Sequence, residues 1–389
     1  QRQRKLLRLC VRNMSSSVEP EIIVKQVNNL MTIELNRPKA LNSLNLDMCN
    51  QMKDLLNSQI NVENTKVGAF LLKGNGGKAF CAGGDVKSIY NELITAKEKG
   101  LEVGTGKPGS LHSDFFRNEY VMNQLLGNSL VPQVSWWDGI VMGGGVGISV
   151  LGEYRIATEK TLFAMPETAI GIFPDVGSSA WLPHLSDGFG PYVGLTGVRL
   201  KAADLLHSGI ATHYITSDKF EDLVSQLSED TLPLDPSASR KVIKDILWRL
   251  QGCCDKPDPS SAVIIPNEPA IVRCFGREVT SVEDIMSKLE SEMTTADHKE
   301  WAQNTMEVLS KMSPTSLKIT FEQLRKGHSL SLNRCLQMEY RMMMQCMKKP
   351  DFQEGIRSVL IEKGKNPPNW NPATLAEVTP EIVENHFKP

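Results

Sequence analysis

The hydrophobic positions of the chain follow two different patterns, with a change near residue 225. In the first part, short apolar runs alternate with glycine-containing loops and with amphipathic segments. These runs cover residues 21–36, 67–74, 131–139 and 154–158. Their length and composition predict strands, and the first run predicts two strands joined by a turn at Asn28 and Asn29. Strands that alternate with helices indicate an α/β fold whose ligands bind in the loops at strand ends.

Helices are expected between these strands. Apolar side chains at helical spacing predict helices over about 46–58 and 113–126, and a further helix that starts near Val86. Another helix should follow the three glycines at 143–145. We expect residues 74–85 and 163–177 to form loops, because glycine and proline interrupt every regular pattern there.

Beyond residue 225 the pattern becomes helical. Clusters of Pro, Ser and Asp predict loops at 229–239 and 255–269. Between and after these loops the apolar spacing predicts helices, including 281–292, 297–311, 332–347 and 352–363. The expected organisation is an N-terminal segment over 1–18, an α/β core over 19–225 and a helical region over 226–389.

The N-terminal segment has a composition of its own. Basic residues stand at positions 2, 4, 5, 8 and 12, serines follow, and Glu19 is the first acidic residue. This composition is typical of a mitochondrial transit peptide, so a location in the mitochondrial matrix is expected. A disordered basic tail is the alternative.

Composition narrows the possible partners. The 43 basic and 45 acidic residues of the 389-residue chain leave a net charge of −2, so no nucleic-acid partner is predicted. The eight cysteines show no C-x-x-C spacing, and no metal-ligand spacing occurs, so neither disulfides nor a metal site are expected. The uncharged run between Asp138 and Glu153 is too short to cross a bilayer, and no membrane partner is predicted.

Two glycine motifs are the first candidates for chemistry. G-G-G at 143–145 and A-G-G-D at 82–85 each follow a predicted buried strand, but no dinucleotide-binding, P-loop or G-x-S-x-G motif is present. Free backbone N–H groups at Gly84 and Gly144 would form an oxyanion hole if they converged. Tight helix packing, or turns that need positive φ, are the alternatives for either motif taken alone.

Three acidic residues lie in apolar surroundings. Glu167 and Asp175 are the only formal charges between Thr161 and Ser186, and each follows a proline. Burial would raise the pKa of such carboxyl groups and suit them to acid–base catalysis, although one of them could be a structural helix cap. Glu119 lies on the apolar face of its predicted helix, where surface glutamates are uncommon. An ion pair with Arg117 or an edge position is the alternative.

Together these motifs resemble the crotonase (enoyl-CoA hydratase/isomerase) superfamily. The segments LNRPKALNSLN, FCAGGDVK, DGIVMGGGVGIS and MPETAIGIFPDVGSS occur in the order and spacing of that family, over roughly residues 20–215. MSPTSLKIT and DFQEGIRSVLIEK extend the similarity to one hydrolase branch of the family almost to the C-terminus. The resemblance implies a crotonase-like ββα spiral core with a helical C-terminal region.

The resemblance also implies roles for individual residues. Gly84 and Gly144 would donate to the carbonyl oxygen of an acyl-CoA thioester, while Glu167 and Asp175 would bind and act on the acyl group. Glu119 would contact the substrate. Coenzyme A would be part of the substrate rather than a separate cofactor. Its contacts are implied for Ala40, Ala82, Gly83, Gly84 and Asp85.

One departure from the hydratase pattern favours hydrolysis. Hydratases carry a catalytic glutamate three residues after the middle glycine, where this chain has Gly147. The resemblance therefore implies hydrolysis of a short 3-hydroxyacyl-CoA in valine breakdown, with 3-hydroxyisobutyryl or 3-hydroxypropionyl as the acyl group. Whether Glu167 is nucleophile or general base stays open. A hydratase or isomerase, or a non-catalytic binding protein, are the alternatives, and a homo-oligomer is possible because family members often form trimers.

Overall fold

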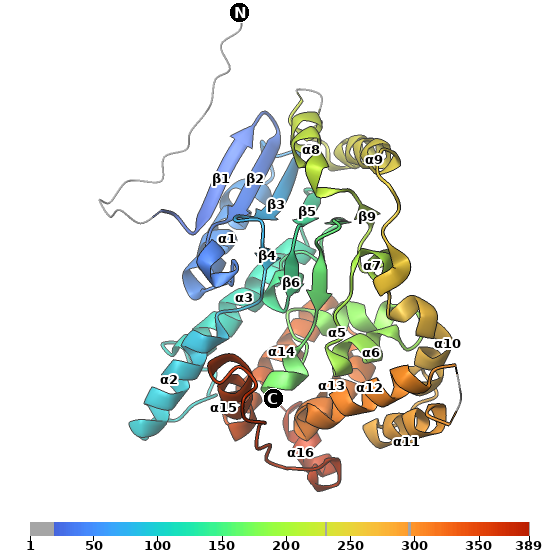
Figure 1. Cartoon of the computed structure of the whole chain (residues 1–389). Coiled ribbons are helices and arrows are strands. Elements are labelled where there is room, and N and C mark those ends of the chain that lie inside the picture. Colours follow the sequence, from blue (N-terminus) through green and yellow to red (C-terminus); the bar gives the residue numbers. More distant parts are fainter. Residues whose placement is uncertain (1–18, 230–231, 295–296, 389) are drawn as a thin grey trace, which may run out of the picture.

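The computed structural model describes residues 19–229, 232–294 and 297–388 (Figure 1). The predicted transit segment at 1–18 lies outside these ranges. The larger of two sheets has the strand order β1-β2-β3-β5-β7-β9, in which β1 pairs antiparallel with β2 and the other neighbours are parallel. Its strands are β1 (Ile22–Val27), β2 (Leu30–Leu35), β3 (Ala69–Gly74), β5 (Gln133–Trp137), β7 (Tyr154–Ala157) and β9 (His213–Tyr214).

A second, smaller sheet forms, and two of its three strands fall in segments predicted as loops. The parallel strands β4 (Ala79–Cys81), β6 (Ile140–Met142) and β8 (Leu162–Ala164) are three residues long each. The prediction of continuous loops at 74–85 and 163–177 was wrong at these positions. Strands this short contain too few residues to show a period of two, so the neighbouring glycines and prolines dominated the pattern.

Both faces of the larger sheet are covered, because alternate side chains of its strands enter different hydrophobic clusters. Leu30 and Leu71 pack with residues of α8 (Phe220–Leu227) and α9 (Pro236–Gly252) on one face. Met31 and Phe70 join the main core on the other face, together with residues of α1 (Leu46–Leu55) and α3 (Leu111–Gly127). This arrangement explains why β3 reads as a continuous apolar run.

The helices of the core confirm most of the predicted elements. Asn45, for example, caps the helix that begins at Leu46, because its side chain accepts a hydrogen bond from Met48 N. The core helices are α1 (Leu46–Leu55), α2 (Val86–Glu98), α3 (Leu111–Gly127), α4 (Gly144–Gly147), α5 (Ser178–Trp181), α6 (Phe189–Thr196) and α7 (Ala202–His207).

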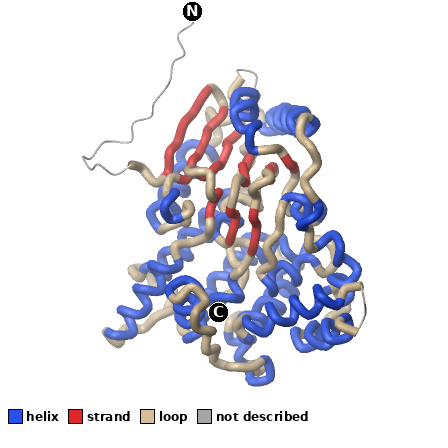
Figure 2. The backbone as a smooth tube through the Cα atoms, viewed as in Figure 1, coloured by secondary structure: helices blue, strands red, loops and turns tan. Residues whose placement is uncertain are grey.

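The region after α9 consists of helices joined by loops, with no strand among its described residues (Figures 1 and 2). The loops predicted at 229–239 and 255–269 are too long: α9 begins at Pro236 and α10 at Ile264. Asp235 caps α9 through a hydrogen bond from Ala238 N, so the Asp-Pro pair marks a helix start rather than a turn. The C-terminal helices are α10 (Ile264–Phe275), α11 (Val282–Glu292), α12 (Lys299–Lys311), α13 (Pro314–Gly327), α14 (Leu332–Met347), α15 (Pro350–Ile356) and α16 (Pro380–Asn385).

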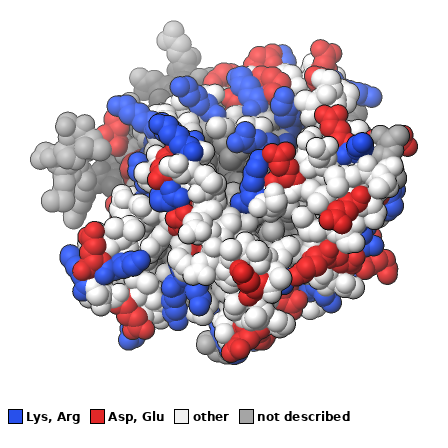
Figure 3. Space-filling view, turned by 60° about the horizontal axis from the view of Figure 1, so that its bottom comes forward, with Lys and Arg blue, Asp and Glu red and all other residues white. Residues whose placement is uncertain are grey.

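The helical region and the α/β core share one hydrophobic interior. A single cluster of buried side chains contains Phe116 of α3 and Met342 of α14. The predicted boundary at residue 225 falls within α8. On the face shown in Figure 3, basic and acidic side chains are interspersed around an uncharged area. Among the described residues, no helix is long and apolar enough to cross a membrane.

Candidate active site

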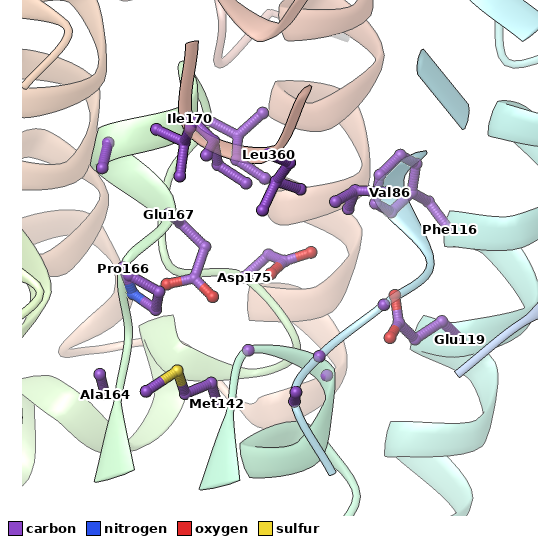
Figure 4. Close-up of a pocket in the computed structure, with 18 of the residues that line it drawn as sticks. Val86, Phe116, Glu119, Met142, Ala164, Pro166, Glu167, Ile170, Asp175 and Leu360 are labelled. Atoms are coloured by element: carbon purple, nitrogen blue, oxygen red, sulfur yellow. The ribbon is translucent and has the colours of Figure 1, made fainter. Parts of the chain in front are cut away.

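A cavity of about 310 Å³ lies where the two glycine turns meet α3 and the Glu167 loop. The C-terminal region closes one side of it through Val359 and Leu360, which belong to the π-helical turn Arg357–Ile361 after α15. Figure 4 shows Glu167 and Asp175 on neighbouring loop segments, with Glu119 entering from α3 on another side. The three acidic residues and both glycine turns therefore belong to one site.

The two glycine turns converge because β4 and β6 are adjacent parallel strands. Gly84 follows β4, Gly144 follows β6, and the residue before each has positive φ: 112° at Gly83 and 47° at Gly143. A Cβ atom at position 144 would lie 3.2 Å from Gly84 N and 2.6 Å from Oε1 of Glu119. Among the described residues, no protein acceptor bonds to either the Gly84 or the Gly144 N–H. Two free donors thus lie close together beside the cavity, as an oxyanion hole requires.

Glu167 lies beside the second glycine turn and lines the same cavity as this pair of donors. It is the first residue of the 3₁₀ turn Glu167–Ile170, directly after Pro166, and its side chain is buried. A Cβ atom at Gly143 would lie 2.9 Å from Oε1 of Glu167, and Oε2 has no hydrogen-bond partner among the described residues. Burial, and then the nearby Asp175, raise the pKa of Glu167 well above its usual value.

Asp175 has a partner that the sequence did not reveal. Its Oδ2 accepts a hydrogen bond of 2.6 Å from the hydroxyl of Tyr120, a buried residue of α3. Burial raises the pKa of Asp175 to about 6, and the Tyr120 hydrogen bond opposes that rise. Tyr120 was missed because its aromatic ring fits the apolar face of α3.

Glu119 is buried without an ion pair in the described structure. Its Oε1 has no hydrogen-bond partner, and burial, Asp175 and Glu167 all raise its pKa well above the usual range. Arg117 instead donates to Gly106 O and stacks on Tyr340, so the alternative of a Glu119–Arg117 ion pair is wrong. An unpaired carboxyl group that points into a cavity is suited to bind a polar part of a ligand.

The residues implied in coenzyme A binding divide into two groups. Ala82 and Gly83 line the cavity with Gly84. Ala40 ends the 3₁₀ turn Pro38–Ala40 outside the cavity lining, and Asp85 pairs with Arg37 at 3.1 Å while it caps α2. These contacts give Asp85 a structural role in this turn, and its role toward coenzyme A stays a prediction.

Position 147, where hydratases carry a glutamate, has no space for a side chain. A Cβ atom at Gly147 would overlap with Cβ of Val176 and lie 3.0 Å from Nδ2 of Asn123. Any larger side chain at position 147 therefore requires Val176 to move. In the described residues no group of three or more His, Cys, Asp or Glu side chains is arranged to hold a metal ion.

Comparisons with known proteins agree with this geometry. The model of a family described as enoyl-CoA hydratase/isomerase matches residues 30–387. With this match, the fold and the paired glycine turns, the chain belongs to the enoyl-CoA hydratase/isomerase (crotonase) family. The expected crotonase-like α/β core with a helical C-terminal region is confirmed.

Several curated relatives share one name. The chain is 43% identical over 356 residues to the mitochondrial 3-hydroxyisobutyryl-CoA hydrolase of Xenopus laevis, a match that covers 91% of this chain and 85% of that protein. It is 42% identical over 368 residues to the enzyme of the same name from Homo sapiens, covering 95% and 88%.

Among solved structures, the fold is similar to a carnitinyl-CoA dehydratase from Mycobacterium thermoresistibile. The TM-score is 0.77 at 32% identity, and the match covers 95% of this chain and 97% of that chain. An enoyl-CoA hydratase from Rhodobacter sphaeroides has a TM-score of 0.76 at 27% identity, covering 95% and 98%.

Proposed function

We propose that this protein hydrolyses the thioester of a short 3-hydroxyacyl-CoA to the free acid and coenzyme A. The names of its relatives support 3-hydroxyisobutyryl-CoA, an intermediate of valine catabolism, as the substrate, with 3-hydroxypropionyl-CoA as a second. One observation carries the choice of hydrolysis over hydration: Glu167 lines the same cavity as two free N–H groups, while Val176 closes the position of a second hydratase carboxylate.

In this proposal, the thioester carbonyl oxygen accepts hydrogen bonds from the N–H groups of Gly84 and Gly144. These donors stabilise the negative charge that develops on the oxygen in the tetrahedral intermediate. Because the donors belong to the backbone, they need no reorganisation during the reaction. Each such donor contributes on the order of 3 kcal/mol to the stabilisation of a transition state.

Glu167 supplies the base or the nucleophile. As a general base it takes a proton from water, whose oxygen attacks the carbonyl carbon. As a nucleophile its carboxylate attacks that carbon and forms a mixed anhydride, which water then hydrolyses. In both routes the C–S bond breaks, coenzyme A leaves as a thiolate, and the acyl group ends as a carboxylic acid.

The other two carboxyl groups orient the reactants. Asp175, held by Tyr120, interacts electrostatically with Glu167 and orients the water or the acyl group. Glu119 accepts a hydrogen bond from the 3-hydroxyl group of the substrate. A buried acceptor left without its donor is costly, so this contact favours hydroxylated acyl groups over plain ones.

The names of the relatives support a mitochondrial location. They are named as mitochondrial enzymes, and we place this protein in the mitochondrial matrix, where the basic composition of residues 1–18 would direct it. We also propose that the protein can form a homo-oligomer. No cofactor takes part in the proposed reaction, since coenzyme A enters as part of the substrate.

A thiol-release assay tests the proposed function. We expect coenzyme A release from 3-hydroxyisobutyryl-CoA and 3-hydroxypropionyl-CoA, and much slower release from isobutyryl-CoA, which lacks the hydroxyl group. Crotonyl-CoA should be neither hydrated nor hydrolysed at a comparable rate. Rapid hydration of crotonyl-CoA without free thiol would overturn the proposal in favour of a hydratase.

A further inference from the structure

The turn that carries Asp175 adopts an unfavourable backbone conformation. Val176 has φ 53° and Gly177 has φ 91°, so two consecutive residues lie in the left-handed region. A β-branched residue in this region is strained, and the conformation persists only where surrounding contacts determine it. The contacts that hold this turn therefore decide where the Asp175 carboxyl group lies.

Gln323 of α13 holds one side of the turn. Its Nε2 donates to the backbone oxygen of Pro174 at 2.6 Å and to the hydroxyl oxygen of Ser179 at 2.8 Å. The side chain of Gln323 is fully buried. Its two partners, Pro174 and Ser179, lie 149 and 144 positions before it in the sequence. Pro174 directly precedes Asp175, so Gln323 acts on the backbone next to the carboxyl group.

Glu339 of α14 holds the other side. Its carboxyl group accepts hydrogen bonds from Gly177 N at 2.7 Å, from Ser179 N at 2.9 Å and from the Ser179 hydroxyl at 2.6 Å. The Ser179 hydroxyl therefore accepts from Gln323 and donates to Glu339, which connects the two helices through the turn. The next residue, Tyr340, packs edge-on against Tyr120, the donor to Asp175.

Neither side chain is a favourable choice for stability alone. Glu339 is fully buried, and in the described ranges no Lys, Arg or His forms an ion pair with it. Burial raises its pKa to about 8 despite three donated hydrogen bonds. Gln323 leaves its buried Oε1 without a hydrogen-bond partner in the described structure. Apolar side chains of similar volume often stabilise a protein as well as such polar groups do.

We propose that Gln323 and Glu339 are positioning residues for Asp175, which they hold against Tyr120 and toward Glu167 through the turn 174–179. The inference rests on the proposed catalytic role of Asp175. It assigns to the helical C-terminal region a direct part in the geometry of the active site, beyond covering the core.

Kinetic coupling tests this assignment. Glu339→Gln keeps the volume but turns an amide N–H₂ group toward backbone donors, and Gln323→Leu removes both donated hydrogen bonds. We expect either change to lower kcat for 3-hydroxyisobutyryl-CoA roughly tenfold to a hundredfold, while KM changes less than about threefold. In an Asp175→Asn background the same changes should lower kcat less than about twofold. The effects of residues that act through one group are not additive, so little remains to lose once Asp175 is replaced.

The control is Glu322→Gln, one position from Gln323 on the outer side of α13, where Glu322 pairs with Lys326. It should leave kcat unchanged in both backgrounds. Wild-type kcat in both Glu339→Gln and Gln323→Leu, or an equal loss with and without Asp175, would overturn the assignment. An equal loss would show that the two residues act on stability or on another group.

A crystal structure of either folded variant gives a readout that does not depend on turnover. We expect the Asp175 carboxyl group to move out of hydrogen-bond distance from the Tyr120 hydroxyl, which is 2.6 Å away in the wild-type protein. An undisturbed Tyr120–Asp175 hydrogen bond in both variants contradicts the inference. If the wild-type protein releases no thiol from the hydroxyacyl thioesters, the proposed function fails, and this structural result still decides the inference.

Discussion

Three buried carboxyl groups share one cavity, and their protonation states determine what each can do. Burial raises the pKa of Glu119, Glu167 and Asp175, and their mutual repulsion adds to the effect at both glutamates. Tyr120 is the hydroxyl donor that opposes this rise at Asp175. The site thus combines Asp175, whose pKa is raised to about 6, with two glutamates whose pKa values are raised well above the usual range, a setting suited to acid–base catalysis.

Replacement of Glu167 by Gln removes the proposed base or nucleophile and keeps the shape of the side chain. We expect kcat to fall by on the order of 10²–10⁴, while the variant still binds the thioester. Calorimetric titration with 3-hydroxyisobutyryl-CoA and the thiol-release assay measure the two effects separately. Full turnover by the variant would remove Glu167 from the mechanism.

The pH dependence of activity should depend on Tyr120. Glu167 and Asp175 act in their ionised forms in the proposed mechanism, so kcat/KM should fall as the pH drops through their raised pKa values. Tyr120→Phe removes the hydrogen bond that keeps the pKa of Asp175 down at about 6, so the acid limb should move to higher pH. Profiles over roughly pH 5 to 9 test this. Tyr90→Phe on α2 serves as the control, and an unshifted limb in Tyr120→Phe would refute the prediction.

Glu119 should reduce stability while it contributes specificity. Because its folded-state pKa is raised, the folded protein binds this proton more tightly than the unfolded chain, and stability is lost as the pH rises above the unfolded pKa. We expect Glu119→Gln to raise the thermal midpoint, more at about pH 8 than at about pH 5. The variant should also lose preference for hydroxyacyl over plain acyl thioesters. A lower midpoint at both pH values would contradict this interpretation.

At the scale of elements, two adjacent short strands decide the chemistry. β4 and β6 end at the same edge of the small sheet, so the glycine turns after them present their N–H groups to one cavity. The helix that follows the second turn packs Gly147 directly against Val176, next to Asp175. A second hydratase carboxylate is therefore excluded in two ways. Residue 147 is glycine, and Val176 occupies the space that a larger side chain would need.

The contact between Gly147 and Val176 predicts what happens when the hydratase glutamate is introduced at position 147. Gly147→Glu should not create hydratase activity, because the new side chain overlaps with Val176 and displaces the Asp175 turn. Overpacking of this kind typically costs about 1–3 kcal/mol of stability, and thiol release should fall as well. Crotonyl-CoA hydration and thermal unfolding measure the outcome. Appreciable hydration by this single variant would show that the contact yields easily.

At the scale of the whole molecule, the helical C-terminal region completes the site. It supplies Val359 and Leu360 to the cavity, and α15 packs against the 3₁₀ turn that carries Glu167. Gly355 makes one of the close approaches, since a Cβ atom there would lie 2.5 Å from both Cα and the carbonyl carbon of Ile170. The region therefore contacts the loops of both Glu167 and Asp175.

Gly355→Ala tests the importance of this packing. Alanine is the better helix former by about 1 kcal/mol, so local propensity alone predicts a more stable protein. We expect the opposite, with a loss of roughly 1–3 kcal/mol in the free energy of unfolding and reduced thiol release. Gly252→Ala is the matched control, since nothing lies within 4 Å of its added Cβ atom. A stabilised, fully active Gly355→Ala variant would contradict the proposed close packing.

Local patterns in the sequence were sufficient for several parts of this protein. The strands β1, β2, β3 and β5, the helix α3 and the two glycine motifs follow from the period of apolar residues and from the special backbone freedom of glycine. The burial of Glu167 and Asp175 was also predictable, because each is isolated in an apolar loop, and that of Glu119 because it lies on the apolar face of its helix. These features depend on residues close together in the chain, so the sequence by itself determined them.

The tertiary structure alone decided which distant groups meet. The small sheet was hidden because its strands have three residues each. The contacts of Asp175 with Tyr120, of Pro174 with Gln323 and of Gly177 with Glu339 span 55, 149 and 162 residues. No periodicity or spacing records such pairs, because they form only when helices from both ends of the chain pack around one turn.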